Sequence, residues 1–143
     1  MAFRATAKWI DDFRFEAWDG DGRHMKMDAS EVAGGQGDGF RPAELPLIGL
    51  LGCTGIDTIE ILKKMRQPVE GLELSVESGK AEGKPPTGYD GIRIAYSFTG
   101  EGLDAKKVEQ AVRLSEEKYC TVGTALSAGT TITHTITING EKL

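Results

Sequence analysis

The stretch LIGLLGCTGIDTIEILKKMRQ, residues 47–67, decides the fold. Its apolar side chains recur every three to five positions, which is the periodicity of a helix with one buried face. We expect one long helix, or two short ones in sequence, within residues 43–66, and the regular helix should begin at or just before Pro46, because a proline beyond the first turn loses a helical hydrogen bond. Pro68 should end it, and Cys53 lies near its middle.

Three glycines, Gly49, Gly52 and Gly55, surround Cys53 on this predicted helix. Each costs about 1 kcal/mol of helix stability relative to alanine, so their presence in a helix calls for a structural or functional explanation. A strip of small residues lets another backbone or a ligand approach closely. Two interpretations stay open: tight helix packing, including packing across a dimer, and access to the thiol of Cys53.

Outside this helix, apolar and polar residues alternate in the pattern of strands. Asp104 is a typical N-cap for a second helix, which carries a Glu109–Arg113 pair at i,i+4 spacing and ends near Cys120. The resulting order is βββ-α-ββ-α-β, an α+β fold in a single domain over residues 1–143. The strands are expected around residues 3–9, 13–17, 25–27, 72–76, 92–98 and 132–138.

Two glycine-rich segments are predicted to be loops rather than phosphate-binding motifs. GGQGDG, residues 34–39, has the wrong glycine spacing for a dinucleotide fingerprint, and Asp38 would repel an anion. GKAEGKPPTG, residues 79–88, places Pro85 where a P-loop needs serine or threonine. We expect a mobile loop in the first case and a turn-rich loop in the second.

Composition limits the function. The chain has 143 residues, 39% of them hydrophobic and 27% charged, which is typical of a globular protein with a real core. Its formal net charge of −5 argues against binding to nucleic acid or to anionic membranes. No apolar run approaches the roughly 18 residues of a membrane span. We therefore expect a cytoplasmic protein, in which two cysteines do not form a static disulfide.

His134 and the cysteines also raise the question of a metal. His134 lies on the apolar face of the last predicted strand, where a hydrogen-bonded core histidine is commoner than a proton shuttle or a metal ligand. A zinc site from Cys53, Cys120, His24 and His134 lacks the usual ligand spacing. The sequence therefore predicts neither a metal nor a bound cofactor.

Two segments together resemble a known family. RPAELPLIGLLGCTGIDTIEILKKMRQ, residues 41–67, and LSEEKYCTVGTALS, residues 114–127, are similar to the OsmC/Ohr family of osmotically inducible and organic hydroperoxide resistance proteins, and most similar to its YhfA-like branch. The opening ATAKWI and the closing THTITING also fit, so the resemblance covers nearly the whole chain. It implies an intertwined homodimer in which strands of both subunits share sheets around central helices, with active sites at the interface.

The resemblance also implies a chemistry, a thiol-dependent peroxidase that reduces organic hydroperoxides in oxidative-stress defence. Cys53 corresponds to the peroxidatic cysteine, Cys120 to the resolving cysteine and Glu44 to the family's active-site carboxylate. The peroxide oxidises Cys53 to a sulfenic acid, Cys120 condenses with it, and an external dithiol of the dihydrolipoyl type regenerates the pair.

The arginine near the peroxidatic thiol is the point at which this sequence departs from the family's pattern. In the peroxidase branches an arginine from an N-terminal loop lowers the pKa of the thiol. Arg14 matches that arginine only with a one-residue slip, the glycine-arginine loop is missing, and Arg41 is a nearby substitute. The alternative is a non-catalytic protein that binds a small ligand or senses redox state, with the cysteines as sensor or vestigial groups.

Overall fold

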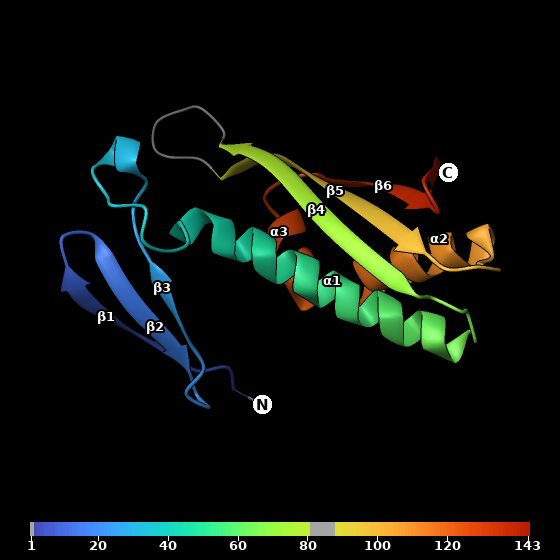
Figure 1. Ribbon diagram of the computed structural model, residues 1–143, viewed down its shortest axis with the longest axis horizontal. Helices are drawn as coiled ribbons and strands as arrows, with labels where there is room; N and C mark the ends of the chain where they lie inside the picture. Colours follow the sequence, from blue (N-terminus) through green and yellow to red (C-terminus); the bar gives the residue numbers. More distant parts are fainter. Residues whose placement is uncertain (1, 81–87) are drawn as a thin grey trace. The chain divides into compact units, whose positions relative to one another are not determined.

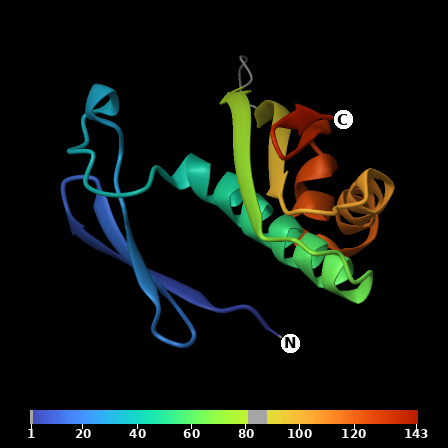
Figure 2. The same cartoon turned by 45° about the vertical axis from the view of Figure 1, so that its right-hand side comes forward.

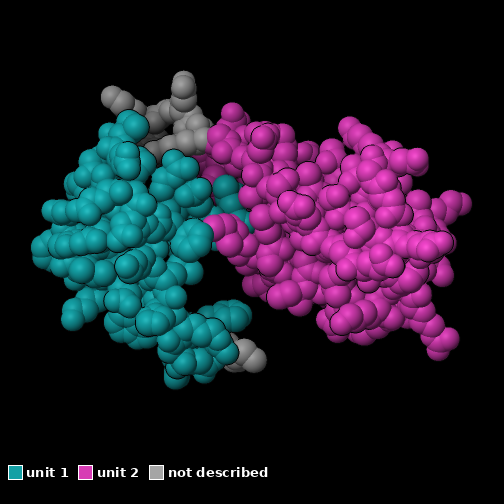
Figure 3. Space-filling model, viewed as in Figure 1, with its two compact units in different colours: residues 1–47 teal, residues 48–143 magenta. Residues whose placement is uncertain are grey.

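A computed structural model describes residues 2–80 and 88–143 of the chain. The chain divides into two compact units, residues 1–47 (unit 1) and residues 48–143 (unit 2), which Figure 3 shows in different colours. Each unit is described by itself below. The single-domain organisation that the sequence suggested stays a prediction.

Unit 1 is a three-stranded antiparallel meander in the order β1-β2-β3, as the sequence predicted (Figure 1). Asp12, with a φ of 39°, turns the chain between the first two strands. At the second turn the Asp19 carboxylate accepts the backbone N–H groups of Asp21 and Arg23. The elements are β1 (Ala5–Asp11), β2 (Arg14–Asp19), β3 (His24–Met27) and two short 3-10 helices, η1 (Glu31–Ala33) and η2 (Pro42–Glu44).

The long helix α1 (Leu45–Lys64) begins one residue before Pro46, which confirms the expected start. Proline is tolerated there because the first-turn N–H groups have no partner within the helix. The helix ends where Arg66 adopts a left-handed conformation with a φ of 57°, two residues before Pro68. One face of α1 is buried at a spacing of three to four residues: Leu50, Thr54, Gly55, Thr58 and Leu62.

Unit 2 has a four-stranded sheet in the order β4-β5-β6-β7. β5 pairs antiparallel with β4 and parallel with β6, and a turn at Asn139-Gly140, both with positive φ, leads into the short β7. β7 was not predicted. β4 continues to Lys80, further than expected, and residues 81–87 of the expected turn-rich loop lie outside the described residues. The strands are β4 (Gly71–Lys80), β5 (Tyr89–Thr99), β6 (Ile132–Ile138) and β7 (Glu141–Lys142).

The crossover from β5 to β6 consists of three helical pieces: α2 (Ala105–Leu114), the π-helix η3 (Ser115–Tyr119) and α3 (Thr121–Ser127). The Asp104 carboxylate caps α2 by accepting the N–H groups of Lys106 and Lys107, as predicted. The expected pair of Glu109 with Arg113 is present at 3.4 Å. The π-helix and α3 were not predicted.

The core of unit 2 lies against one face of β5. Side chains on this strand alternate between buried and exposed, and the buried face consists of Ile92, Ile94, Tyr96 and Phe98. Helix α1 runs along this side of the sheet, and α2 contributes Val108, Ala111 and Val112 to the same core (Figures 1 and 2). The sheet and its helices therefore hold the segment around Cys53 in a fixed place.

Helix α1 with the turn before it, Pro42–Lys64, is long and apolar enough to cross a membrane, judged by length and composition alone. Its mean hydropathy is 1.6, and 22% of the apolar window is buried within the single chain. The core helix of a globular protein meets the same criteria. The buried face of α1 hydrogen-bonds to the sheet through Thr54, which is the behaviour of a core helix.

Candidate functional site

The two cysteines lie in unit 2 and meet there. Cys53 is half-buried in α1, and Cys120 follows the π-helix as the N-cap of α3. The two side chains are near enough for Cys53 to contribute to the raised pKa of the Cys120 thiol, and both cysteines are free. A disulfide between them requires their Cα atoms to come within about 7 Å.

The Cys120 thiol is held in place by its own turn. Its side chain is 1% exposed, and its Sγ accepts the backbone N–H of Gly123 at 3.2 Å. Burial, together with the contacts to Cys53, raises the pKa of this thiol to about 11. A side chain at Gly123 would collide with Cys120 Sγ, because an added Cβ would lie 3.2 Å away. At neutral pH Cys120 is therefore a protonated thiol.

A buried hydroxyl cluster links the segments that carry the cysteines. Thr54, which follows Cys53, places its Oγ1 2.9 Å from both Tyr96 Oη on β5 and Ser115 Oγ on the π-helix. The Ser115 hydroxyl also donates to the Thr54 carbonyl at 3.1 Å, while the Ser115 carbonyl accepts the Cys120 N–H at 2.8 Å. These bonds fix the π-helix against α1 and so fix Cys120 relative to Cys53.

The cluster continues to a histidine. Tyr96 donates its hydroxyl to Glu116 Oε1 at 2.7 Å, and Glu116 Oε2 lies 2.8 Å from Nδ1 of His134. The Glu116 hydrogen bond, which outweighs the opposing effect of burial, raises the pKa of His134. His134 is thus a hydrogen-bonded histidine on the sheet, as predicted from the sequence, and its hydrogen-bond partner is Glu116.

Asp57 lies one helical turn after Cys53 on α1. Its Oδ2 is shielded from solvent and has no hydrogen-bond partner among the residues that the structure describes. Burial raises the pKa of Asp57, and the nearby charge of Glu60 adds to the effect. The Asp57 charge also acts on Cys120, where it contributes to the raised pKa of the thiol. This carboxyl is therefore electrostatically coupled to the thiol pair.

A groove of about 510 Å³ opens beside Asp57. The crossover contributes Leu114 and Tyr119 to its lining. These residues lie at the two ends of the π-helix that precedes Cys120. Ile61 and Met65 continue the wall along α1. The groove gives a small molecule or water a route toward the side of α1 that carries Asp57.

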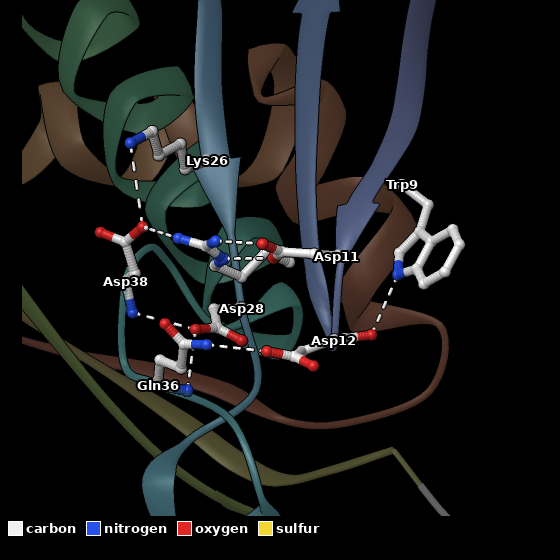
Figure 4. A network of polar contacts seen from close by, with 8 residues as sticks. Trp9, Asp11, Asp12, Lys26, Asp28, Gln36 and Asp38 are labelled. Atoms are coloured by element: carbon white, nitrogen blue, oxygen red, sulfur yellow. Dashed lines mark hydrogen bonds and ion pairs between the residues drawn. The ribbon is translucent and has the colours of Figure 1, made fainter.

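Arg14, the arginine that the resemblance suggested, lies in unit 1 and is already paired. Its guanidinium binds the carboxylate of Asp11 with two nitrogens and that of Asp38 at 3.0 Å (Figure 4). Hydrogen bonds to these two carboxylates raise the pKa of Arg14 and lower that of Asp11. With two carboxylates on one guanidinium, the local charge is not positive.

The glycine-rich segment 34–39 is anchored by Asp28. This carboxylate is 1% exposed and accepts the backbone N–H groups of Ala29 at 2.7 Å and of Gln36 and Asp38 at 3.0 Å each (Figure 4). The same bonds, with the backbone of Asp38 contributing most, lower the pKa of Asp28. That this segment is mobile stays a prediction; the Asp28 carboxylate binds it at Gln36 and Asp38, and the Asp38 side chain binds Arg14.

Glu44 and Arg41 form a pair at the end of unit 1. The Arg41 Nε donates to Glu44 Oε1 at 3.0 Å, and the Arg41 backbone N–H donates to the same carboxylate at 3.2 Å. The side-chain bond is the main reason why the pKa of Glu44 is lowered. Glu44 thus caps the short helix η2 immediately before α1 and holds Arg41, the second arginine that the sequence offered.

Asp57, Tyr96 and Glu116 were not singled out from the sequence. Asp57 could have been found, because its i,i+4 spacing from Cys53 puts both side chains on one side of a helix. Tyr96 and Glu116 carry no local signal, since their roles depend on the packing of β5 against the π-helix. Among the described residues, no three His, Cys, Asp or Glu side chains gather as ligands of a metal ion.

Comparisons with known proteins agree on one family. Residues 35–135 match the model of the OsmC-like protein family. The chain is 34% identical to protein YhfA of Escherichia coli strain K12 over 132 residues, which cover 92% of this chain and 94% of that protein.

Solved structures of the family are also similar. An OsmC-like protein from Mycoplasma pneumoniae has a TM-score of 0.83 at 15% identity over 96% of this chain and 97% of its own. An organic hydroperoxide resistance protein OsmC from Legionella pneumophila has a TM-score of 0.73 at 17% identity over 96% and 97% of the two chains. At these identities the likeness concerns the fold.

Proposed function

Because the chain belongs to the OsmC-like family, with an α+β fold of that type, we propose that it is a thiol-dependent peroxidase that reduces organic hydroperoxides. The observation that carries the proposal is that unit 2 holds two free cysteines, the half-buried Cys53 and the buried Cys120, near enough for Cys53 to act on the pKa of Cys120. The Legionella pneumophila relative, which shares the fold, is named an organic hydroperoxide resistance protein.

The roles of the two cysteines follow from their exposure. Cys53 is the more accessible thiol and attacks the O–O bond of the peroxide, which releases an alcohol and leaves a sulfenic acid. Cys120, which is fully buried, attacks that sulfenic acid and forms the disulfide with loss of water. An external dithiol, of the dihydrolipoyl type, then reduces the disulfide, and no bound cofactor takes part. The proposed location is the cytoplasm.

A homodimer is part of the proposal, because each unit exposes apolar surface that one chain does not cover. Unit 2 has an apolar groove of about 540 Å³ between α1 and β4, where Gly52, Gly55 and Ile56 lie beside Leu72 and Leu74. A Cβ on Gly49 or Gly52 would meet no other atom within 4 Å, so the glycine strip leaves room for a second copy.

Unit 1 supports the same conclusion. Its largest apolar side chains are exposed, and a three-stranded sheet needs a covered face to be stable. A second copy of the chain, with strands added around α1, covers both surfaces at once. Light scattering that finds a stable monomer at micromolar concentration would contradict this part of the proposal. The exposed residues are Phe3, Trp9, Ile10, Phe13, Phe15, Met25, Val32 and Phe40.

Glu44 and an arginine complete the proposed site by analogy with the family. Arg14 is bound by two carboxylates of its own unit, so Arg41, which Glu44 holds, is the better candidate for a charge near the thiolate. Glu44→Gln should then reduce peroxide turnover at least about tenfold with little change in melting temperature. Normal turnover with a lower melting temperature would assign Glu44 to helix capping alone.

The pairing of Arg14 also favours a second candidate function. If no arginine reaches Cys53, the thiol lacks the charge that activates it toward peroxide, and the chain acts as a non-catalytic ligand-binding or redox-sensing protein. Such a protein would use the grooves beside α1 to hold a small ligand.

Mass spectrometry of the intact protein separates the two functions. One equivalent of tert-butyl hydroperoxide should remove the mass of two hydrogen atoms within the mixing time, and dihydrolipoamide should restore it. The Cys53→Ser variant, treated in parallel, should keep its mass. An unchanged mass of the unsubstituted protein would contradict the peroxidase and support the second function.

A further inference from the structure

The second step of the proposed reaction raises a chemical problem. A buried thiol with a pKa of about 11 is protonated at neutral pH, and a protonated thiol is a poor nucleophile. Cys120 must therefore lose its proton as it attacks Cys53. Water has little access, because the Cys120 side chain is 1% exposed. A base on the protein is needed.

Most acidic and basic side chains near the pair are already engaged. Both oxygens of Glu116 are taken, one by Tyr96 and the other by His134. His134 makes its contact with that same carboxylate through Nδ1. Glu44 belongs to unit 1 and binds Arg41.

Asp57 differs from these groups. One carboxylate oxygen is shielded from solvent and has no hydrogen-bond partner in the described part of the chain. An unpaired buried oxygen is destabilising and calls for an explanation. Its charge reaches Cys120, and it lies one turn from Cys53, where side chains on a helix are about 5–6 Å apart. It also shares a groove with Tyr119, the neighbour of Cys120.

We propose that Asp57 is the general base of the resolving step, which takes the proton from Cys120 as this thiol attacks the sulfenic acid of Cys53. This inference rests on the proposed peroxidase function. In the step the S–H bond of Cys120 breaks, an S–S bond forms, and the S–O bond of Cys53 breaks. The proton passes through Asp57 to the departing hydroxide, which leaves as water. No other oxidant is needed, because the hydroperoxide has already oxidised Cys53.

The surroundings of Asp57 suit this role. Burial and the charge of Glu60 raise the pKa of Asp57, which makes it a stronger base than an exposed aspartate and a better match to a thiol. Lys64 offers little compensation, because it pairs with Glu60 at 3.3 Å. The remaining titratable groups that face this side of α1 are Tyr119 and the two thiols.

The test compares Asp57→Asn with the unsubstituted protein and with Glu73→Gln. The control removes an exposed carboxylate of β4 that does not act on Asp57 or Cys120, so it should change the resolving rate less than about twofold. The sulfenic acid is trapped with dimedone to follow the first step, and the disulfide is followed by intact mass after rapid quenching. Asp57→Asn should form the sulfenic acid at the normal rate and convert it to disulfide at least about tenfold more slowly.

The pH profile adds a readout that a structural role would not change. In the unsubstituted protein the resolving rate should fall as the pH drops through the pKa of Asp57, which lies above its ordinary value. In Asp57→Asn the rate should instead rise with the thiolate fraction of Cys120, toward about pH 11.

The outcomes separate the two proposals. A normal resolving rate in Asp57→Asn overturns the role of Asp57 and leaves the peroxidase intact. If the unsubstituted protein forms no sulfenic acid, the peroxidase itself fails. A normal first step in Asp57→Asn also shows that this variant is folded.

Discussion

Residues 1–47 and residues 48–143 are held together by different forces. Every apolar side chain that is buried in the described part of the chain belongs to unit 2, where α1 and α2 cover one face of β5. Unit 1 buries a single side chain, the carboxylate of Asp28, and relies on the ion pairs and hydrogen bonds around Arg14 (Figure 4). The difference teaches that unit 2 has an apolar core of its own, whereas the described residues of unit 1 contain no buried apolar side chain.

The chemistry follows the same division. The two thiols and Asp57 lie in unit 2, where burial raises the pKa values of Cys120 and Asp57. Both arginines that the resemblance suggested lie in the polar unit, each bound to a carboxylate. Substitutions in the two units should therefore differ in kind.

The largest difference is expected between two phenylalanines. Phe98 is fully buried in unit 2, so Phe98→Ala should lower the free energy of unfolding by about 3–5 kcal/mol. Phe13 is 54% exposed in unit 1, so Phe13→Ala in an isolated chain should cost about 0.5 kcal/mol. Urea unfolding at several protein concentrations measures both values. A cost for Phe13→Ala that grows with protein concentration sharpens the comparison, because it reports a cover by a second copy.

Equal costs for the two phenylalanines at every concentration would break the comparison. They would mean that unit 1 buries Phe13 in a core of its own.

The thiols of unit 2 should differ in reactivity by a large factor. With a pKa of about 11, roughly one Cys120 thiol in a thousand is ionised at pH 8. Iodoacetamide at that pH should therefore label Cys53 first and Cys120 at least about a hundredfold more slowly than the same cysteine in the unfolded chain. Peptide mass mapping over time measures both rates. Equal labelling of the two cysteines in the folded protein would contradict the burial of Cys120.

Asp28 provides the corresponding test in unit 1. Its folded-state pKa is lowered, so its contribution to stability is present above the unfolded value of about 3.9 and is lost as the pH falls through the folded value. Asp28→Asn, which keeps the shape but removes the charge, should speed hydrogen exchange of the Gln36 and Asp38 amides. The core amides of β5 should keep their exchange rates.

The matched control is Asp21→Asn, whose carboxylate is largely exposed. Its effect on those amides should be small. Exchange at Gln36 and Asp38 that is as slow in Asp28→Asn as in the unsubstituted protein would show that other contacts hold the segment.

The smallest expected effect concerns His134. Its pKa is raised by Glu116, so the pair stabilises the fold below the unfolded value of about 6.5, and this contribution is lost as the pH rises through the folded value. The contribution should be less than about 1 kcal/mol, because the pair is partly exposed. Glu116→Gln should lower the pKa of His134, which an NMR titration of its ring measures. An unchanged titration would place another group beside the imidazole.

Local sequence signals predicted the elements of the fold well. The periodicity of residues 47–67 predicted α1, and the two prolines, Pro46 and Pro68, predicted where it begins and ends. Asp104 predicted the start of α2. Each of these signals acts within one or two helical turns. The π-helix and α3 were missed, since a π-turn depends on contacts such as the one between Ser115 and Thr54. The dipeptide Asn139-Gly140 is typical of a hairpin turn, but β7 after it has only two residues, which is too short to show strand alternation.

The candidate site was predictable only in part. Cys53 and Cys120 were found through the resemblance, and the structure brings them together. The coupling of Asp57 depends on its burial against the crossover, which the sequence does not reveal. The pairing of Arg14 with Asp38 depends on a segment that Asp28, ten residues earlier in the sequence, holds by a hydrogen bond, so no local sequence pattern predicts it.

The most direct test of the thiol chemistry compares Cys53→Ser with Cys120→Ser after one equivalent of tert-butyl hydroperoxide, with the intact mass as the readout. Cys120→Ser keeps the attacking thiol, so it should gain one oxygen atom, stall as a sulfenic acid and go on to sulfinic acid when peroxide is in excess. Cys53→Ser should consume no peroxide and keep its mass, because a serine alkoxide is not available at neutral pH. Identical behaviour of the two variants toward the peroxide would contradict the assignment of an attacking and a resolving cysteine.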